Sequence, residues 1–365
     1  MRSLLLLRVR NRSPSLRHIW LRRLVAAFRD KIGPLFCLAT AVKLAFIIDP
    51  IDRLDPTHDS SVALMEAAQE MGHDVWMLLA NSLTVMESKT WATVMPVKLV
   101  PVTLGENRWV AVESWFELGT SQFLPLETFD VVWMRIDPPV NTAYLYATYL
   151  LDYVNPAKTR VVNAPSGIRA ANEKMYALQF LKSIPTTIVT QNKQVIRDFL
   201  AQEGRVVMKP LGGKAGEGIL FLEEGDRNFN SLVEISTVQG SIPVMVQTYL
   251  PDAKLGDKRV ILLNGEPIGA VNRVPTGDDF RGNMAVGGRA DQVDITPRDR
   301  EISAELAPAL RRDGLIFVGI DIIGGNLTEV NVTSPTGIRE VDRLSGLTLG
   351  IEVMKWLERG ISPNL

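Results

Sequence analysis

The 365-residue sequence has few of the side chains that form disulfides, zinc sites or nucleophilic triads. It contains one cysteine, Cys37, and three histidines, His18, His58 and His73. A single cysteine excludes an intrachain disulfide, and no cluster of Cys and His is available for structural zinc. A Ser-His-Asp triad would depend on one of three scattered imidazoles. Any metal in this protein should therefore be a hard cation held by oxygen ligands.

Long apolar runs are also missing. No run approaches the roughly 18 residues that a membrane-spanning helix needs. The composition, 46% hydrophobic and 22% charged, excludes a disordered chain, a collagen and a coiled coil. The length is sufficient for two or three domains. We therefore expect a globular, cytoplasmic protein that makes no contact with a membrane.

Basic residues are concentrated at the N-terminus. Nine of the 40 Lys and Arg, but only one of the 41 Asp and Glu, lie in residues 1–41. The rest of the chain is acidic, which argues against a nucleic-acid partner. Residues 1–41 are either untranslated, because the true start is Val42, or a transit peptide, a secretory signal or a disordered tail. We favour a start at Val42, because this residue opens the first predicted strand.

Alternating strands and helices are predicted in the first half of the chain. A parallel α/β domain over 42–163 follows from this alternation. The predicted strands are 43–49, 74–79, 131–135 and 159–162, the predicted helices are 59–70 and 141–153, and residues 80–128 are predicted to form short strands and turns.

The second half has a different pattern, with antiparallel hairpins and fewer helices. The predicted helices are 172–181, 193–202, 296–312 and a last one that ends near Leu357. The predicted strands are 187–189, 205–209, 219–222, 244–249, 258–263, 266–274, 316–323 and 327–332.

A glycine-rich loop follows Lys209, which stands at the end of a predicted strand. Glycine lets backbone amides approach phosphate oxygens closely, and lysine adds positive charge. The spacing fits neither a P-loop nor a Gly-x-Gly-x-x-Gly motif. The segment is therefore either a phosphate-binding loop or a flexible hairpin turn. Its glycines are Gly212, Gly213, Gly216 and Gly218.

Two carboxylates and an amide are expected to meet near the end of the chain. Glu329 and Asn331 are two residues apart on a strand, so their side chains share a face. If Gly324-Gly325-Asn326 is a three-residue turn, Ile323 pairs with Leu327 and Asp321 lies opposite Glu329. Such oxygen donors suit Mg²⁺. The alternatives are a solvated polar face, or a two-residue turn that separates the two carboxylates.

Several cations have no local partner in the sequence. They are Lys174, Arg259, Arg273 and Arg281. Arginine suits carboxylates and phosphates, although each of these residues could equally be a solvated surface group. The glycine-rich polar stretch 275–290 is either a lid over a charged substrate or a surface loop.

Specific strings carry a resemblance to a known family. The strings are Phe46-Ile47-Ile48-Asp49-Pro50, Asp59-Ser60-Ser61, Met134-Arg135-Ile136-Asp137-Pro138-Pro139, Asn172-Glu173-Lys174, Lys209-Pro210-Leu211, Gly256-Asp257-Lys258-Arg259-Val260, Arg281-Gly282-Asn283, and Gly319 to Thr336. Their order and spacing over about 43–357 resemble the bacterial-type glutathione synthetases of the ATP-grasp superfamily.

This resemblance implies a fold and an activity. The fold would be an ATP-grasp domain over 164–358, with a central lobe at about 174–245 and a C-terminal lobe at about 246–358. A Rossmann-like α/β domain over 42–163 would precede it. The activity would be the ligation of γ-glutamylcysteine and glycine to glutathione, with ATP converted to ADP and phosphate through an acyl phosphate.

The resemblance also implies residue roles. Arg259 would lie near the transferred phosphoryl group, and Arg273 and Arg281 would be substrate or lid arginines. The metal ligands for Mg²⁺ or Mn²⁺ would be Asp321, Glu329 and Asn331. The ATP-binding residues would be Lys174, Lys209, Gly212, Gly213, Gly216, Gly218, Gln247, Tyr249 and Leu250.

Family members are homo-oligomers, commonly tetramers. Two alternatives remain at this stage. One is an ATP-grasp ligase for another acid and amine, such as one that adds glutamate to a protein or joins two D-alanines. The other is a nucleotide-binding scaffold of the same fold without catalysis.

Overall fold

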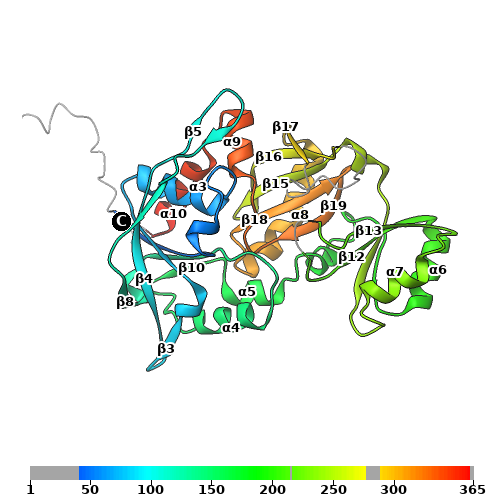
Figure 1. Ribbon diagram of the computed structural model, residues 1–365, viewed down its shortest axis with the longest axis horizontal. Coiled ribbons are helices and arrows are strands. Elements are labelled where there is room, and N and C mark those ends of the chain that lie inside the picture. Colours follow the sequence, from blue (N-terminus) through cyan, green and yellow to red (C-terminus); the bar gives the residue numbers. More distant parts are fainter. Residues whose placement is uncertain (1–40, 214–215, 277–287, 362–365) are drawn as a thin grey trace, which may run out of the picture. The chain divides into compact units, whose positions relative to one another are not determined.

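Three large sheets and one two-stranded sheet form in a computed structural model that describes residues 41–213, 216–276 and 288–361. Figure 1 shows them with their helices. Within these ranges, no helix combines the length and apolarity that crossing a membrane requires. The predictions for residues 1–40 lie outside the described residues.

The first sheet contains a parallel core in the order β10-β9-β1-β2. This order confirms the parallel α/β prediction. Asp59 caps α3 as predicted, because its carboxylate accepts the backbone N–H groups of Ser61 and Val62. The bounds are β1 (Lys43–Ile47), α3 (Ser60–Glu70), β2 (Asp74–Leu78), β9 (Val131–Met134), α4 (Thr142–Leu151), β10 (Arg160–Val162) and α5 (Pro165–Ala170).

Short antiparallel strands extend this sheet beyond β2, as predicted for residues 80–128. Strand β4 pairs with β2, and β3, β7 and β8 pair with β4. Strands β5 and β6 form a separate hairpin. The bounds are β3 (Thr84–Met86), β4 (Lys89–Leu99), β5 (Thr103–Leu104), β6 (Trp109–Val110), β7 (Phe116–Leu118) and β8 (Gln122–Pro125).

The second sheet is antiparallel in the order β11-β14-β12-β13 and has a core of its own. Helices α6 and α7 cover it, and the buried residues Ile196, Val206 and Val233 belong to one apolar cluster. The bounds are β11 (Thr187–Thr190), α6 (Lys193–Glu203), β12 (Arg205–Pro210), β13 (Leu220–Glu223), α7 (Phe229–Ser236) and β14 (Val244–Thr248).

The third sheet is antiparallel in the order β17-β16-β15-β18-β19. Its strands share two apolar clusters with the first sheet. Helix α10 returns to pack on α3, where a Cβ atom on Gly350 would lie 2.9 Å from the Cβ atom of Ala67. The bounds are β15 (Asp257–Leu263), β16 (Glu266–Val274), β17 (Arg289–Gln292), α8 (Pro297–Arg312), β18 (Phe317–Ile323), β19 (Asn326–Asn331), α9 (Ile338–Ser345) and α10 (Leu349–Ile361).

The predicted helix 172–181 is wrong. Only a short 3₁₀ helix, Met175–Gln179, forms there. The backbone carbonyl of Glu173 accepts the N–H of Val330 instead, so β19 holds this segment in a non-helical path. Such 3₁₀ helices also occur at Ile51–Arg53, Ala80–Ser82, Leu126–Thr128 and Pro251–Leu255.

Gly167 in α5 gives a first test of the packing between the first and third sheets. A Cβ atom there would lie 2.0 Å from the backbone oxygen of Asp313, which follows α8. We expect Gly167→Ala to lower the free energy of unfolding by about 1–3 kcal/mol, because backbone cannot move aside as a side chain can. Urea denaturation measures this, with Ser166→Ala on the exposed side of α5 as the control. An unchanged midpoint for Gly167→Ala would show that the backbone at Asp313 moves away from the added methyl group without a measurable loss of stability.

His58 gives a pH-dependent test of the contact between α9 and the loop before α3. Its hydrogen bond to Glu340 raises the pKa of His58 above 6.5, although burial opposes this. The stabilisation is therefore full below about pH 6.5 and is lost as the pH rises through the raised pKa. We expect the difference in Tm between wild type and His58→Gln to shrink from about pH 5 to pH 9.

His73 is the matched control, because burial lowers its pKa. The stability that His73 contributes should therefore decline as the pH falls. The difference in Tm between wild type and His73→Gln should therefore shrink as the pH falls from about 9 to 5, the opposite of the trend for His58→Gln. Parallel trends for the two variants would contradict the assignment for His58.

Candidate active site

Two β-bulges set the positions of charged side chains on one face of the third sheet. The turn between β18 and β19 contains two residues, Gly324 and Gly325, both with positive φ, so the predicted three-residue turn is wrong. Ile323 pairs with Asn326, not with Leu327. A register shift next to Asp321 then restores the predicted pairing of Asp321 with Glu329. The expected juxtaposition is confirmed, although for a different reason.

The second bulge lies in the hairpin of β15 and β16. Its register shifts between Ile261 and Leu262, which places Asp257 opposite Arg273. Arg259 on β15 lies opposite Asp321 on β18. Because directly paired residues share a face, both ion pairs lie on the same side of the sheet.

Asp321 is the centre of this charged ladder. It is 2% exposed, and both of its carboxylate oxygens accept hydrogen bonds from Arg259, at 3.0 Å for Nη2. Arg273 Nη2 lies 3.0 Å from its Oδ1. Burial favours the neutral acid, but Arg259 and Arg273 outweigh it and hold the pKa of Asp321 below its usual range. The carboxylate is therefore charged at neutral pH.

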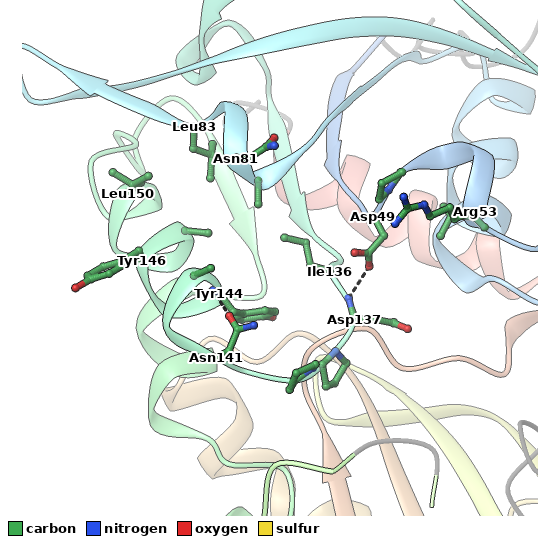
Figure 2. Close-up of a pocket in the computed structure, with 17 residues that line it drawn as sticks. Asp49, Arg53, Asn81, Leu83, Ile136, Asp137, Asn141, Tyr144, Tyr146 and Leu150 are labelled. Carbon is green, nitrogen blue, oxygen red and sulfur yellow. Dashed lines mark hydrogen bonds between the residues drawn. The ribbon is translucent and has the colours of Figure 1, made fainter. Parts of the chain in front are cut away.

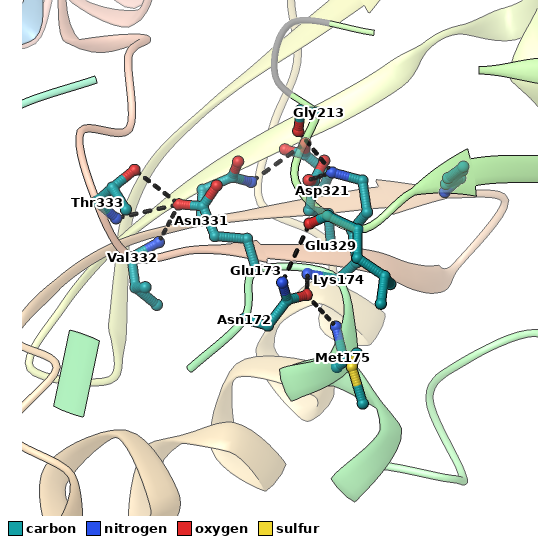
Figure 3. A network of polar contacts seen from close by, with 12 residues as sticks. Asn172, Glu173, Lys174, Met175, Gly213, Asp321, Glu329, Asn331, Val332 and Thr333 are labelled. Carbon is teal, nitrogen blue, oxygen red and sulfur yellow. Dashed lines mark hydrogen bonds and ion pairs between the residues drawn. The ribbon is translucent and has the colours of Figure 1, made fainter. Parts of the chain in front are cut away.

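Lys174 connects the glycine-rich loop to β19. Its Nζ donates to the backbone oxygen of Gly213 at 2.8 Å and lies 3.0 Å from Oε1 of Glu329 (Figure 3). The preceding Glu173 accepts the backbone N–H groups of Val332 and Thr333 at 2.9 and 3.1 Å. These contacts fix the lysine beside the glycine-rich loop and the carboxylates.

Lys209 points towards the same region from β12. Its Nζ donates to Oε1 of Gln247 on β14 at 2.6 Å. Burial lowers the pKa of Lys209, while the charges of Glu329 and Asp257 act in the opposite direction. Lys209 can therefore bind an anionic ligand, whose negative charge would favour the protonated lysine.

The other predicted nucleotide-binding residues lie around Lys209. Tyr249 follows β14, where its ring packs edge-on against Phe221 at 4.9 Å between centroids, and Leu250 follows it in the chain. In the glycine-rich loop, Gly216 and Gly218 have φ angles of 81° and 67°. Gly212 and Gly213 precede residues 214–215, which lie outside the described residues.

A cavity of about 490 Å³ opens on this face. It lies between the third sheet and the loops at the carboxyl ends of β1 and β9. Arg259, Arg273, Glu329 and Asn331 line it from the third sheet. From the other side it is lined by Arg53, Leu54, Asp55, His58, Asp59, Asp137 and Pro138.

The donor chemistry of Asp321, Glu329 and Asn331 fits a hard cation. Asn331 Nδ2 lies 3.3 Å from Oδ2 of Asp321, so the two side chains meet, and Glu329 lies opposite on the neighbouring strand. Two carboxylates and an amide oxygen are ligands that Mg²⁺ accepts beside substrate phosphates. Among the described residues, no group of three His, Cys, Asp or Glu forms a metal site, so the amide of Asn331 is needed to complete the set.

The structure brings together most of the predicted site. Lys174, Lys209, Arg259 and Arg273 converge on the three oxygen donors. Arg281 and most of the predicted lid lie outside the described residues, so their roles stay predictions.

Two residues that organise the site, Glu173 and Asp257, are not among the predicted site residues. Oε1 of Glu173 accepts a hydrogen bond from Oγ1 of Thr333, in the segment after β19. Oδ2 of Asp257 lies 2.6 Å from Nη2 of Arg273. The string Asn172-Glu173-Lys174 could have indicated a role for Glu173. A carboxylate next to a predicted ligand-binding lysine needs hydrogen-bond donors of its own, so it was a candidate for fixing the local structure. The position of Asp257 depends on the bulge, for which Gly269 inside the predicted strand 266–274 was the available signal.

Solved structures with a similar fold include an ATP-grasp ligase and a D-cycloserine synthetase. The D-cycloserine synthetase DcsG matches with a TM-score of 0.60 and 15% identity, over 88% of this chain and 100% of that one. The ATP-grasp ligase PsnB, complexed with a minimal precursor, matches with a TM-score of 0.57 and 18% identity, over 88% and 99%. Together with the antiparallel lobes described above, these matches show that the chain has the ATP-grasp fold.

The sequence comparisons are more specific. Residues 42–169 match the family model of the prokaryotic glutathione synthetase N-terminal domain, and residues 173–346 match its ATP-grasp domain. The glutathione synthetase of Nostoc sp. is 65% identical over 88% of this chain and 99% of its own. That of Thermosynechococcus vestitus is 65% identical over 86% and 99%. The chain belongs to the prokaryotic glutathione synthetase family and is an ATP-dependent ligase.

Asp321 and Glu329 should differ in their effects on stability. Asp321→Asn leaves two buried guanidinium groups without their shared anion, so we expect the free energy of unfolding to fall by about 3–5 kcal/mol. Glu329→Gln should change it much less, because the Glu329 side chain is 23% exposed. Urea denaturation in the presence of a chelator measures both. Equal, small losses would contradict the central role of Asp321.

Proposed function

We propose that the chain joins γ-glutamylcysteine to glycine at the cavity described above, with one ATP converted to ADP and phosphate. The observation that carries this proposal is that two arginines, a carboxylate and an amide line one cavity: Arg259, Arg273, Glu329 and Asn331. Lys174 contacts Glu329, and Asp321 contacts Arg273, directly behind this lining. The family match supports the choice of substrates.

The first step transfers the γ-phosphoryl group of ATP to the cysteinyl carboxylate. The bond between the β,γ-bridging oxygen and the γ-phosphorus breaks, ADP leaves, and an acyl phosphate forms. In this proposal Lys174 and Lys209 bind the phosphates, and Arg259 stabilises the charge of the transferred group. We assign Arg273 to the carboxylate substrate, because it lines the same cavity.

Asp321, Glu329 and Asn331 would hold Mg²⁺ or Mn²⁺. When bound, the cation would neutralise phosphate charge during transfer. In the structure Arg259 and Lys174 already neutralise two of these side chains. We infer that Lys174 leaves Glu329 for a phosphate when the nucleotide binds.

The second step joins the two substrates. The amine of glycine attacks the acyl carbon, the bond to the phosphate oxygen breaks, and inorganic phosphate leaves while the amine loses a proton. This step requires that water be kept away from the acyl phosphate. The cavity is walled on both sides by folded structure, which supports this requirement.

We also propose the domain division at 42–163 and 164–358, with the central lobe near 174–245. The second sheet and its separate apolar cluster support a central lobe that moves as a unit. A homotetramer and a cytoplasmic location stay predictions, which sedimentation analysis and cell fractionation would test.

An omission experiment tests the reaction. The chain from Val42 onwards is incubated with Mg²⁺, ATP, γ-glutamylcysteine and glycine, each component is left out in turn, and ADP release is measured. Release that requires all four components is the expected result. Release only with other acid and amine pairs would indicate a different ATP-grasp ligase, and ATP binding without release would indicate a scaffold.

Glu329→Gln tests the metal assignment. We expect turnover to fall about 10²-fold or more, because an anionic ligand of the cation that neutralises phosphate charge is lost. The concentration of Mg²⁺ at half-maximal rate should rise as well. Glu301→Gln, on the exposed side of α8, makes the same chemical change away from the site and should leave both values unchanged. Normal Mg²⁺ dependence in Glu329→Gln would refute the assignment.

A further inference from the structure

His58 stands between two cavities. It lines the first cavity, of about 490 Å³, together with Arg259, Arg273 and Glu329. It also lines a second cavity, of about 710 Å³, which is bounded by α9 and by the hairpin of β5 and β6. Because exposed residues such as Arg108 form part of its wall, the second cavity is open to solvent. The imidazole therefore borders the proposed reaction site as well as water.

Glu340 holds the ring of His58 from α9. Nδ1 of His58 lies 2.5 Å from Oε1 of Glu340. A carboxylate accepts hydrogen bonds but donates none, so Nδ1 carries a hydrogen and the lone pair of the neutral ring is on Nε2. Among the described residues, no hydrogen bond engages Nε2. This is the arrangement of a histidine base that a carboxylate orients, with one ring nitrogen free to take up a proton.

The pairing also favours the charged form of the imidazole. Its hydrogen bond to Glu340 raises the pKa of His58 above 6.5 against the effect of burial, and the charges of Asp55 and Asp59 add to the increase. A side-chain base is most effective when its pKa lies near the pH at which the enzyme works. The other charged groups that line the two cavities with His58 are Arg53, Arg108, Asp137, Glu173, Glu217, Arg259, Arg273, Glu329 and Arg343.

Three carboxylates of the same wall are engaged in holding loops. Asp59 accepts two backbone N–H groups as the cap of α3. Asp55 accepts two hydrogen bonds within its own loop. Asp137 accepts a serine hydroxyl, and Asp49 accepts its backbone N–H at the edge of a neighbouring cavity of about 770 Å³ (Figure 2). These oxygens fix the backbone beside His58 and are not free to take up a proton.

The carboxylates on the other walls leave one competitor. Glu173 accepts the backbone N–H groups that follow β19, and Glu329 pairs with Lys174. Glu217, from the glycine-rich loop, has no hydrogen bond or ion pair from its side chain among the described residues. A carboxylate without a supporting partner is a weaker base towards an ammonium than an imidazole that a carboxylate supports. His58 is therefore the better candidate.

The second step of the proposed reaction needs such a base. Free glycine is an ammonium at neutral pH, and only the neutral amine can attack the acyl phosphate. The conversion of the ammonium to an amide nitrogen releases two protons. One of them can leave on the departing phosphate, and the other needs an acceptor inside the cavity. Bulk water cannot be that acceptor without also reaching the acyl phosphate.

We propose that His58 is the general base of the second step. Nε2 takes one proton from the ammonium of glycine, the neutral amine attacks the acyl carbon, and the bond to the phosphate oxygen breaks. The second proton leaves on the phosphate. The imidazolium, stabilised by Glu340, then releases its proton to water in the second cavity. This inference rests on the proposed function, and it makes Glu340 a positioning residue.

His58→Gln separates the two steps. We expect kcat with glycine to fall about 10²-fold or more, because general base catalysis contributes a factor of this size. Formation of the acyl phosphate should be unchanged, because no amine takes part in it. Without glycine, this reversible step moves an oxygen isotope label from the β,γ-bridge of ATP to the other β-phosphate oxygens, and the rate of label exchange measures it. An unchanged kcat with glycine would overturn the proposal.

Hydroxylamine in place of glycine is the second probe. Its nitrogen is neutral at pH 7, so it attacks the acyl phosphate without the help of a base. His58→Gln should therefore form the hydroxamate as fast as the wild type, although it is slow with glycine. A loss of equal size with both acceptors, or a loss of label exchange, would mean that His58 only maintains the shape of the cavity, and would overturn the proposal.

Glu340→Gln tests the pairing through the pH profile. The rate with glycine should rise with pH through the pKa of His58, because the neutral ring is the base. Loss of the Glu340 carboxylate removes the largest influence that raises this pKa, so the rise should move to lower pH. In His58→Gln this rise should be absent. A rise at the same pH in wild type and Glu340→Gln would overturn the role of Glu340.

His73→Gln is the matched control. It makes the same chemical change at a histidine that lines neither cavity, so all rates should stay as in the wild type. Glu217→Gln tests the competitor, and a loss with glycine in this variant but not in His58→Gln would overturn the proposal. A wild type without label exchange and without glycine-dependent ADP release would refute the proposed function. A wild type that shows both, with an unaffected His58→Gln, would overturn the assignment of the base alone.

Discussion

A single buried carboxylate organises the site. Asp321 interrupts an apolar strand, and a charge in that position is tolerated only because two guanidinium groups surround it. Arg259 and Arg273 depend on Asp321 in turn, because both guanidinium groups are buried and need an anionic partner. Strands β15, β16 and β18 are therefore held in one register by charge as well as by backbone hydrogen bonds. Arg259 and Arg273 of this arrangement also line the first cavity.

The sequence was sufficient for those elements whose apolar pattern is regular. Strands such as β1 and β9 read as buried runs, and the cap at Asp59 is a local signal, so both were predictable. The segment at Asn172–Lys174 was not, because its conformation is imposed by β19, which lies far along the chain. Propensity describes a segment in isolation, and here a tertiary contact overrides it.

The site residues were predictable as types but their register was not. With a two-residue turn and no bulge, Asp321 would pair with Thr328 and Asp257 with Asn272, and the carboxylates would point to opposite faces. Each extra residue, Ile268 in one hairpin and Thr328 in the other, corrects the pairing by one position. The bulge at Thr328 has no marker in the sequence, and Gly269, which stands beside Ile268 in the other bulge, was the one available signal. The correct juxtaposition of Asp321 and Glu329 was therefore reached from an incorrect turn.

The packing of α10 on α3 affects how this chain can be made. Buried residues of α10, including Val353 and Leu357, belong to the same apolar cluster as Leu64 of α3. The first domain to leave the ribosome thus lacks part of its cover until α10 has been synthesised. Its α3 surface remains exposed throughout synthesis of the two lobes that follow. Removal of α10 would accordingly destabilise α3 first, although the two helices lie far apart in the sequence.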